Sequence, residues 1–130
     1  MLLGIKTDGP VAEFSLYEAN GAFRGELQWE ADRQLARRLL AELENFLEAH
    51  ECTMSQLEGL LAFRGPGSFT GLRIGLTVIN TLAYAQSIPV VGETGDDWRE
   101  KAVKRLRNGE NDRIIMPLYG AEARITTPRK

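Results

Sequence analysis

The residues best suited to chemistry lie in one glycine-rich stretch, Arg64 to Gly75, with the sequence RGPGSFTGLRIG. An apolar run precedes it and another follows, the order of a buried strand, a loop and a helix. Such a junction offers backbone amides and a positive helix dipole to an anion, and Ser68 or Thr70 could cap the helix or touch a phosphate. The spacing excludes a Walker-type loop and the dinucleotide fingerprint. Alternatively, the glycines only permit a tight turn and close helix-to-sheet packing.

Other side chains with catalytic potential are few. A hydrolase needs a nucleophile, a base and an orienting group, and the chain has one histidine, His50, and one cysteine, Cys52. His50 ends an amphipathic stretch, where the helix dipole favours a cation, so we expect a helix cap. Cys52 falls in a connecting turn, and Ser68 lacks the sequence of a nucleophile elbow. The sequence therefore predicts no catalytic residue, no cofactor and no metal site.

Composition indicates one soluble globular domain. The chain has 130 residues, of which 43% are hydrophobic and 26% charged, ordinary values for such a protein. A single cysteine excludes a disulfide framework, and no apolar run is long enough to span a bilayer, so we expect a cytoplasmic protein without membrane contact. The net charge of -2 provides no general attraction for nucleic acid, and any such contact must be local.

The elements that position the glycine-rich stretch can be predicted from the spacing of apolar residues. Five short runs of strand-forming residues lie at 2–7, 11–17, 22–29, 59–63 and 90–93. Asn20-Gly21 is a strong hairpin signal, so we expect the first three to form antiparallel strands, with Phe23, Leu27 and Trp29 on one face of the third. The fourth run has no polar residue and predicts a strand buried on both faces.

Three longer runs predict helices, at 30–50, 71–86 and 96–107. The first has one apolar stripe, which includes Leu39, Leu40 and Leu43. The apolar residues of the second cover an arc of about 200°, wider than contact with one sheet requires. We therefore expect the second helix to be buried on two sides, either by a partner or by the first helix of the same chain.

The order of these elements predicts the fold class. Three antiparallel strands, then helix, strand, helix and strand, form an α/β mixed sheet with two parallel crossover strands and helices on its faces. This is the ribonuclease-H-like order. A last apolar stretch at 114–119 predicts one further strand, which would lie at an edge.

The glycine-rich stretch, between a buried strand and an apolar helix ending in IPVVG, resembles the signature of the bacterial TsaB family, also called YeaZ. The resemblance implies an actin-like ATPase (ASKHA) N-terminal lobe at 1–112, then a strand and tail at 113–130 that resemble the start of a second lobe. That second lobe is essentially missing, so the chain is either a naturally shortened scaffold or the first lobe alone. The signature residues are Arg64, Gly65, Pro66, Gly67, Ser68, Phe69, Thr70, Gly71, Leu72, Arg73 and Gly75.

The resemblance also implies a function. TsaB-like proteins are inactive relatives of the catalytic subunit TsaD in the synthesis of N6-threonylcarbamoyladenosine (t6A) in tRNA. They pair with TsaD through their first two helices and act with the ATPase TsaE. We therefore expect a non-catalytic scaffold whose partners are a TsaD-like subunit and a TsaE-like ATPase. A homodimer is a further option. We expect contact with tRNA to be indirect, through the complex. The expected partner-facing residues are Leu39, Leu43, Arg73, Leu76, Thr77 and Asn80.

One departure bears on catalysis. Family members usually open with a strand ending in Ile-Asp-Thr-Ser, and this chain has Lys6 in place of the aspartate. A lysine reverses the charge that a metal would meet, so we expect no ATP hydrolysis by this chain alone. An ATP-using phosphotransferase or a peptidase of the same fold is the enzymatic alternative.

The last predicted helix offers a further alternative, an accessory tRNA-binding module. Its candidate contacts are Lys101, Lys104 and Arg105. A basic helix is usually only a solvated face, and no aromatic residues alternate with these charges as readers of single strands require. Binding that weakens with salt and is lost when Lys104 and Arg105 are changed to glutamate would support this alternative.

Overall fold

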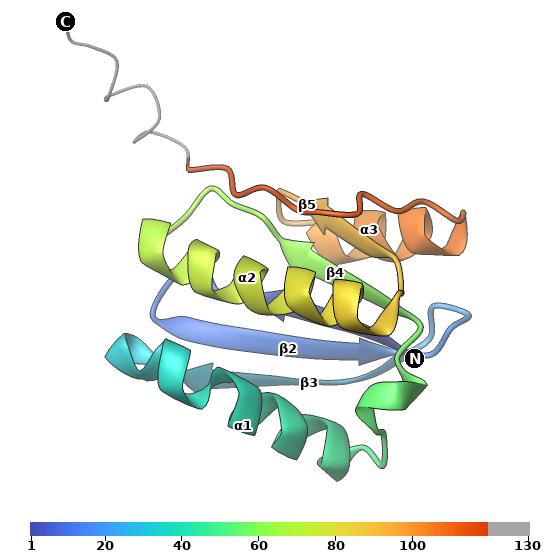
Figure 1. The fold of residues 1–130 in the computed structure, drawn as a ribbon, viewed down its shortest axis with the longest axis horizontal. Coiled ribbons are helices and arrows are strands. Elements are labelled where there is room, and N and C mark those ends of the chain that lie inside the picture. The colour runs from blue at the N-terminus through green and yellow to red at the C-terminus, as the bar shows by residue number, and fades with distance from the viewer. Residues whose placement is uncertain (120–130) are drawn as a thin grey trace, which may run out of the picture.

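A mixed β-sheet forms the centre of this computed structural model, which describes residues 1–119 (Figure 1). Its strands are β1 (Leu2–Lys6), β2 (Val11–Tyr17), β3 (Phe23–Glu30), β4 (Gly59–Phe63) and β5 (Val90–Glu93). The strand order is β3-β2-β1-β4-β5. β1, β2 and β3 pair in antiparallel fashion, and β4 and β5 continue the sheet parallel to β1. The predicted fold class is therefore confirmed.

Helices cover both faces of the sheet. α1 (Leu35–Ala49) and α2 (Phe69–Gln86) lie side by side on one face, and α3 (Trp98–Arg107) lies on the other (Figure 1). Two 3-10 turns, η1 (Asp32–Gln34) and η2 (Met54–Gln56), flank α1. The buried apolar side chains form one cluster that includes those of α1 and a second that includes those of α3. None of the helices in residues 1–119 is long and apolar enough to cross a lipid bilayer.

A register shift in the β2–β3 hairpin changes the face on which Phe23 lies. Leu16 pairs with Gly25, but the next residue, Tyr17, pairs with Phe23. The extra residue on β3 reverses the alternation of side chains. The prediction that Phe23 shares a face with Leu27 and Trp29 is therefore wrong, because Phe23 contacts Tyr17 on the α3 face.

The segment after α3 covers the free edge of β5 without forming a strand. The amide of Val90 donates to Asn111 Oδ1 at 3.1 Å, and the amide of Gly92 donates to Asp112 Oδ2 at 2.9 Å. The side-chain amide of Asn80 then bonds both backbone groups of Ile115, at 2.9 and 3.0 Å. The predicted strand at 114–119 is wrong, because the side chains of Asn80 and Arg64 satisfy backbone groups of Ile115 and Met116 in place of a neighbouring strand.

The predicted division of the chain into 1–112 and 113–130 stays a prediction. Residues 113–119 form an irregular segment, in which Leu118 donates its amide to the carbonyl of Arg64 at 2.7 Å. The predicted tail from residue 120 onward lies outside the described residues.

Candidate functional site

The glycine-rich loop connects β4 to α2 and packs closely on the end of β1. Ser68 caps α2, with its Oγ accepting from the amide of Gly71 at 3.2 Å, and its own amide donates to the carbonyl of Asp8 at 2.8 Å. A Cβ on Gly67 would lie 2.5 Å from that of Asp8, and one on Gly65 would overlap the carbonyl oxygen of Leu118. These contacts favour the interpretation that the glycines permit a tight turn.

The next two signature glycines let α2 approach β1 at backbone distance. The hydroxyl of Thr7 is buried and donates to the carbonyl of Gly71 at 2.8 Å. A Cβ on Gly71 would lie 2.5 Å from the carbonyl oxygen of Thr7, and one on Gly75 would overlap the Thr7 hydroxyl. The loop and these glycines therefore fix the position of α2 on the sheet. The hydrogen bond from Thr7 to Gly71 could not be predicted from the sequence, because the two residues are 64 positions apart.

A cavity of about 430 Å³ lies at the carboxyl end of β1, beside Lys6, Asp8 and Asp96. Open α/β sheets bind ligands at such strand ends. The ammonium group of Lys6 lies 3.7 Å from the Asp8 carboxylate and 4.8 Å from the centre of the Phe63 ring. Lys6 therefore places a positive charge at the strand end and pairs it with the nearby carboxylate. In residues 1–119, no group of three or more His, Cys, Asp or Glu side chains is arranged to hold a metal ion.

His50 and Cys52 lie beyond the end of α1. His50 is the C-cap of α1, as predicted, with its Nδ1 3.0 Å from the carbonyl oxygen of Phe46. Its ring also packs on the Phe46 ring, with 4.7 Å between centroids. Cys52 is buried, and this burial raises the pKa of its thiol. Burial and a raised pKa both oppose the thiolate form that a cysteine nucleophile needs.

Cys52 should therefore react slowly with thiol reagents in the native protein. We expect modification by Ellman's reagent at mildly alkaline pH to be about 100-fold slower than in denaturant, because only the accessible thiolate reacts. The rate of chromophore release measures both reactions. Fast, complete modification of the native protein would contradict the buried position.

Three of the residues expected to face a partner are core residues. Leu39, Leu43 and Leu76 are all buried, with exposed fractions of 1%, 0% and 4%. The prediction is wrong for these leucines because α1 and α2 cover the same face of the sheet and fill the space above it with them. Asn80 holds Ile115 through its side-chain amide, as described above. Arg73 and Thr77 are exposed on α2 and stay candidates.

Other apolar side chains of α1 and α2 remain accessible. Leu40, predicted to join the buried stripe, is 52% exposed. Ile74, Val78 and Leu82 are only partly buried and recur every four residues, so they form one line along α2. The 200° apolar arc predicted for α2 is therefore split between the core and the surface. We call Leu40, Ile74, Val78 and Leu82 the helix-pair surface.

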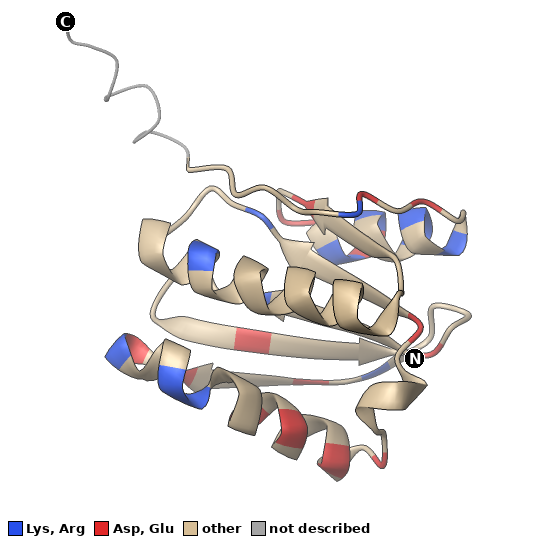
Figure 2. Cartoon of the chain, in the orientation of Figure 1, with Lys and Arg blue, Asp and Glu red and all other residues tan. Residues whose placement is uncertain are grey.

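The position of Leu40 follows from its neighbours on α1. The guanidinium of Arg38 lies 5.0 Å from the centre of the Trp29 ring on the edge strand β3. Leu40 lies about 200° around the helix from Arg38, on the side away from that edge. α2 is the element beside α1 on this side, and its only charged residue is Arg73 (Figures 1 and 2). The α2 part of the helix-pair surface is therefore apolar, whereas Arg37 and Glu44 lie one turn away from Leu40 on α1.

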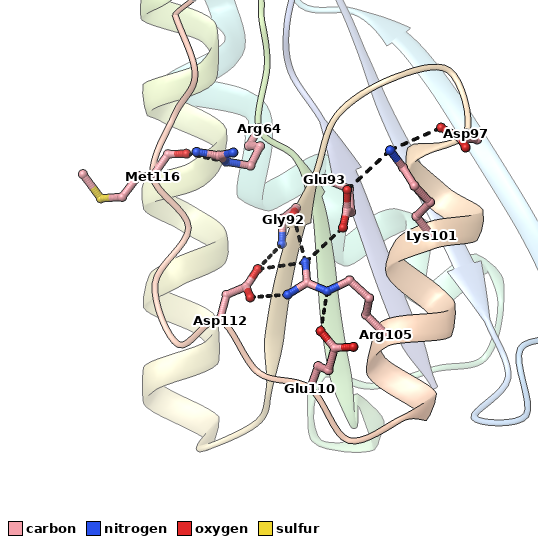
Figure 3. Close-up of polar contacts among 9 residues, drawn as sticks. All are labelled: Arg64, Gly92, Glu93, Asp97, Lys101, Arg105, Glu110, Asp112 and Met116. Carbon is pink, nitrogen blue, oxygen red and sulfur yellow. Dashed lines mark hydrogen bonds and ion pairs between the residues drawn. The ribbon is translucent and has the colours of Figure 1, made fainter.

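Two of the three expected tRNA contacts are held by carboxylates (Figure 3). Arg105 bonds Glu93 at 3.1 Å, Glu110 at 2.7 Å and also Asp112, and it donates to the carbonyl of Gly92 at 3.2 Å. Hydrogen bonds to Asp112 and Glu110 raise the pKa of Arg105 above its ordinary value. Arg105 therefore joins α3, β5 and the segment after α3, and its contact with tRNA stays a prediction.

Lys101 is held in a similar way. Its ammonium group lies 3.5 Å from Glu93 and 3.4 Å from Asp97 (Figure 3). The charge of Lys101 is therefore also matched within the chain, and a tRNA contact at this residue stays a prediction. Lys104 is exposed and forms no ion pair within residues 1–119, so it stays available to a ligand.

Comparison with known proteins agrees with the signature. The family model described as "TsaD: tRNA N6-adenosine threonylcarbamoyltransferase" matches residues 19–94, more than half of the chain. The tRNA threonylcarbamoyladenosine biosynthesis protein TsaB of Haemophilus influenzae is 31% identical over 81 residues, which cover 62% of this chain and 34% of that protein. The chain thus spans about a third of the length of the curated relatives it matches.

Solved structures agree with the fold. YeaZ from Pseudomonas aeruginosa aligns with a TM-score of 0.65 and 29% identity, over 72% of this chain and 43% of that one. RuvC from Thermus thermophilus, in complex with a Holliday junction substrate, aligns with a TM-score of 0.53 and 11% identity, over 94% of this chain and 86% of that one. The second likeness shows only the ribonuclease-H-like fold. With its matched family domain, its signature loop and this fold, the chain belongs to the TsaB/YeaZ family.

Proposed function

We propose that this chain is a non-catalytic scaffold that binds a TsaD-like catalytic subunit in t6A synthesis. The observation that carries the proposal is the helix-pair surface, because α1 and α2 keep these apolar side chains exposed or partly exposed while Leu39, Leu43 and Leu76 are buried in the core. A TsaE-like ATPase joins the same assembly, and tRNA is reached through the complex. A homodimer through the same surface would compete with the partner.

The shape and chemistry of this surface support a helix-on-helix contact. Leu40 and the line of Ile74 and Val78 would form the apolar centre of an interface, with the exposed Arg73 and Thr77 at its rim. Interfaces of standard size have such an apolar centre and a polar rim. Two helices from each subunit would then pack as a four-helix contact.

The position of Lys6 supports the non-catalytic part of the proposal. Its ammonium group lies at the end of β1, 3.7 Å from Asp8. Metal-dependent phosphoryl transfer needs carboxylates that are free to bind the cation. Because Lys6 is paired with the Asp8 carboxylate, that carboxylate is less available to bind a cation. The only cysteine is buried, which opposes a cysteine peptidase.

Leu40→Glu should weaken binding of the TsaD-like subunit from the same organism by at least about tenfold, because a carboxylate would be buried against an apolar partner. Half-exposed Leu40 tolerates a charge in the free protein. Isothermal titration calorimetry measures the affinity, and circular dichroism checks the fold. Leu76 is unsuitable for this test, because a charge at that buried position would disrupt the core.

Asn45→Glu is the matched control. Asn45 is exposed on the same helix, about 140° around the helix axis from Leu40. The substitution therefore adds the same charge to α1, but away from the helix-pair surface. We expect its affinity to stay within about twofold of wild type. Equal affinities for the two variants would show that this surface is not the interface. ATP or peptide turnover by the purified chain alone would support the enzymatic alternative.

A further inference from the structure

A cavity of about 930 Å³ lies on the α3 face of the sheet, between the β2–β3 hairpin and α3. The hairpin contributes Tyr17 and Phe23, and α3 contributes Val103, Lys104 and Arg107. Its volume is that of a small-molecule site. α3 lies on the opposite side of the sheet from α1 and α2 (Figure 1), so this cavity is separate from the helix-pair surface.

One wall of the cavity is an accessible aromatic ring. Phe23 is 56% exposed although it is a large apolar residue. The buried Tyr17 ring supports it from one side, with 5.6 Å between centroids, and the Arg99 guanidinium lies 6.0 Å from its centre. A ring that is fixed and still accessible offers a surface on which a nucleobase stacks. Phe23 reaches this cavity only because of the register shift in the hairpin.

Two uncompensated cations lie at the end of the cavity nearest the hairpin turn. Lys104 and Arg107 are exposed and form no ion pair within residues 1–119. The Cδ of Arg107 lies 3.3 Å from the position of a Cβ on Gly21, so its stem packs on the turn. Arg99, by contrast, pairs with Glu26 at 2.9 Å and Glu13 at 3.7 Å. Lys104 and Arg107 are therefore the groups available to an anionic ligand.

The opposite end of the cavity is acidic. Asp96, Asp97 and Glu100 line it around the first turn of α3, whereas Lys104 and Arg107 lie in the last turn. Along α3, about 15 Å separates Asp97 from Arg107 and about 6 Å separates Glu100 from Lys104. A ligand that carries an anionic group at one end and hydrogen-bond donors at the other would match this gradient.

We propose that this cavity binds a nucleotide. The base stacks on Phe23 and points its amino group toward the acidic end, and the phosphate lies at Lys104 and Arg107. A free nucleotide and an unpaired residue of an RNA strand share this chemistry. The inference goes beyond the scaffold function and does not depend on it, since it uses neither α1 nor α2.

Titration with AMP, adenosine, inorganic phosphate and a short adenine-rich single-stranded RNA tests the proposal. Amide chemical shifts report the site, and a binding isotherm gives each affinity. We expect saturable binding of AMP, RNA or both, with shifts at the hairpin and α3. If AMP binds, adenosine should bind more weakly, because it lacks the phosphate. Binding of AMP alone identifies a free nucleotide as the source, and binding of RNA alone identifies a strand.

Phe23→Ala should weaken this binding about tenfold, because it removes the stacking surface. The double variant Lys104→Glu and Arg107→Glu should weaken it to a similar extent and reduce its salt dependence, and it leaves the Phe23 ring in place. Arg37→Glu is the control, since Arg37 is an exposed cation on α1. The proposal is overturned if neither AMP nor RNA binds, or if the control weakens binding as much as these variants do.

Discussion

Replacing Gly71 with alanine should destabilise the protein by about 2–3 kcal/mol, because a Cβ at this position meets the backbone of β1. The new atom would lie 2.5 Å from the carbonyl oxygen of Thr7, which cannot rotate away as a side chain could. Relief requires α2 to move, and that weakens the 2.8 Å hydrogen bond from Thr7 to Gly71. The higher helix propensity of alanine, about 1 kcal/mol, offsets only part of this cost.

Gly9→Ala is the matched control for this change. No heavy atom lies within 4 Å of a Cβ placed on Gly9, and its φ lies outside the left-handed region. We expect its free energy of unfolding to stay within about 0.5 kcal/mol of wild type. Urea unfolding followed by tryptophan fluorescence measures both variants. If Gly71→Ala proves as mild as the control, the close approach of α2 to β1 does not explain the glycine.

Replacing Arg105 with methionine should destabilise the protein by about 2 kcal/mol, because it removes charged hydrogen bonds from three carboxylates. The side chain of Arg105 is only 26% exposed, and its partners come from β5 and from the segment after α3. Asp112 also receives the amide of Gly92, so loss of Arg105 loosens the covered edge of β5. We expect faster hydrogen exchange of the Gly92 amide in the variant.

Lys104→Met is the control for Arg105. Lys104 is the preceding residue of α3, and it is exposed with no ion pair in the described part of the chain. Its replacement should change the free energy of unfolding by less than about 0.5 kcal/mol. Equal losses for the two variants would indicate a general effect of charge on α3 rather than the Arg105 network. Urea midpoints and exchange of the Gly92 amide distinguish these cases.

The comparison of Arg105→Met with Lys104→Met also separates two roles of the basic residues of α3. Arg105 and Lys101 hold the fold together, whereas Lys104 and Arg107 are left for a ligand. Any loss of RNA binding on charge reversal at Arg105 would therefore reflect damage to the structure. Among the basic residues of α3, only Lys104 and Arg107 can be changed to test nucleotide binding without removing ion pairs of the fold.

Local patterns in the sequence were sufficient to predict the main elements and their order. β5 begins and ends at the predicted residues, and α2 ends at Gln86 as predicted. The amide of Thr53 also donates to Gln56 Oε1 at 2.8 Å, a contact between residues three positions apart. These features depend on residues a few positions apart, so their spacing in the sequence carries the information. The family signature is equally local, since it lies within Arg64 to Gly75.

Other features depend on contacts between distant parts of the chain, and only the tertiary structure decided them. The register shift that brings Phe23 to the α3 face depends on how β2 and β3 pair. The burial of Leu76 and the exposure of Leu40 depend on how α1 and α2 lie on the sheet. The charge of Arg105 is matched by carboxylates from outside α3, so its helical spacing alone suggested a free basic face. The sequence thus determined which elements form, and the packing between them decided which side chains remain available to a partner or ligand.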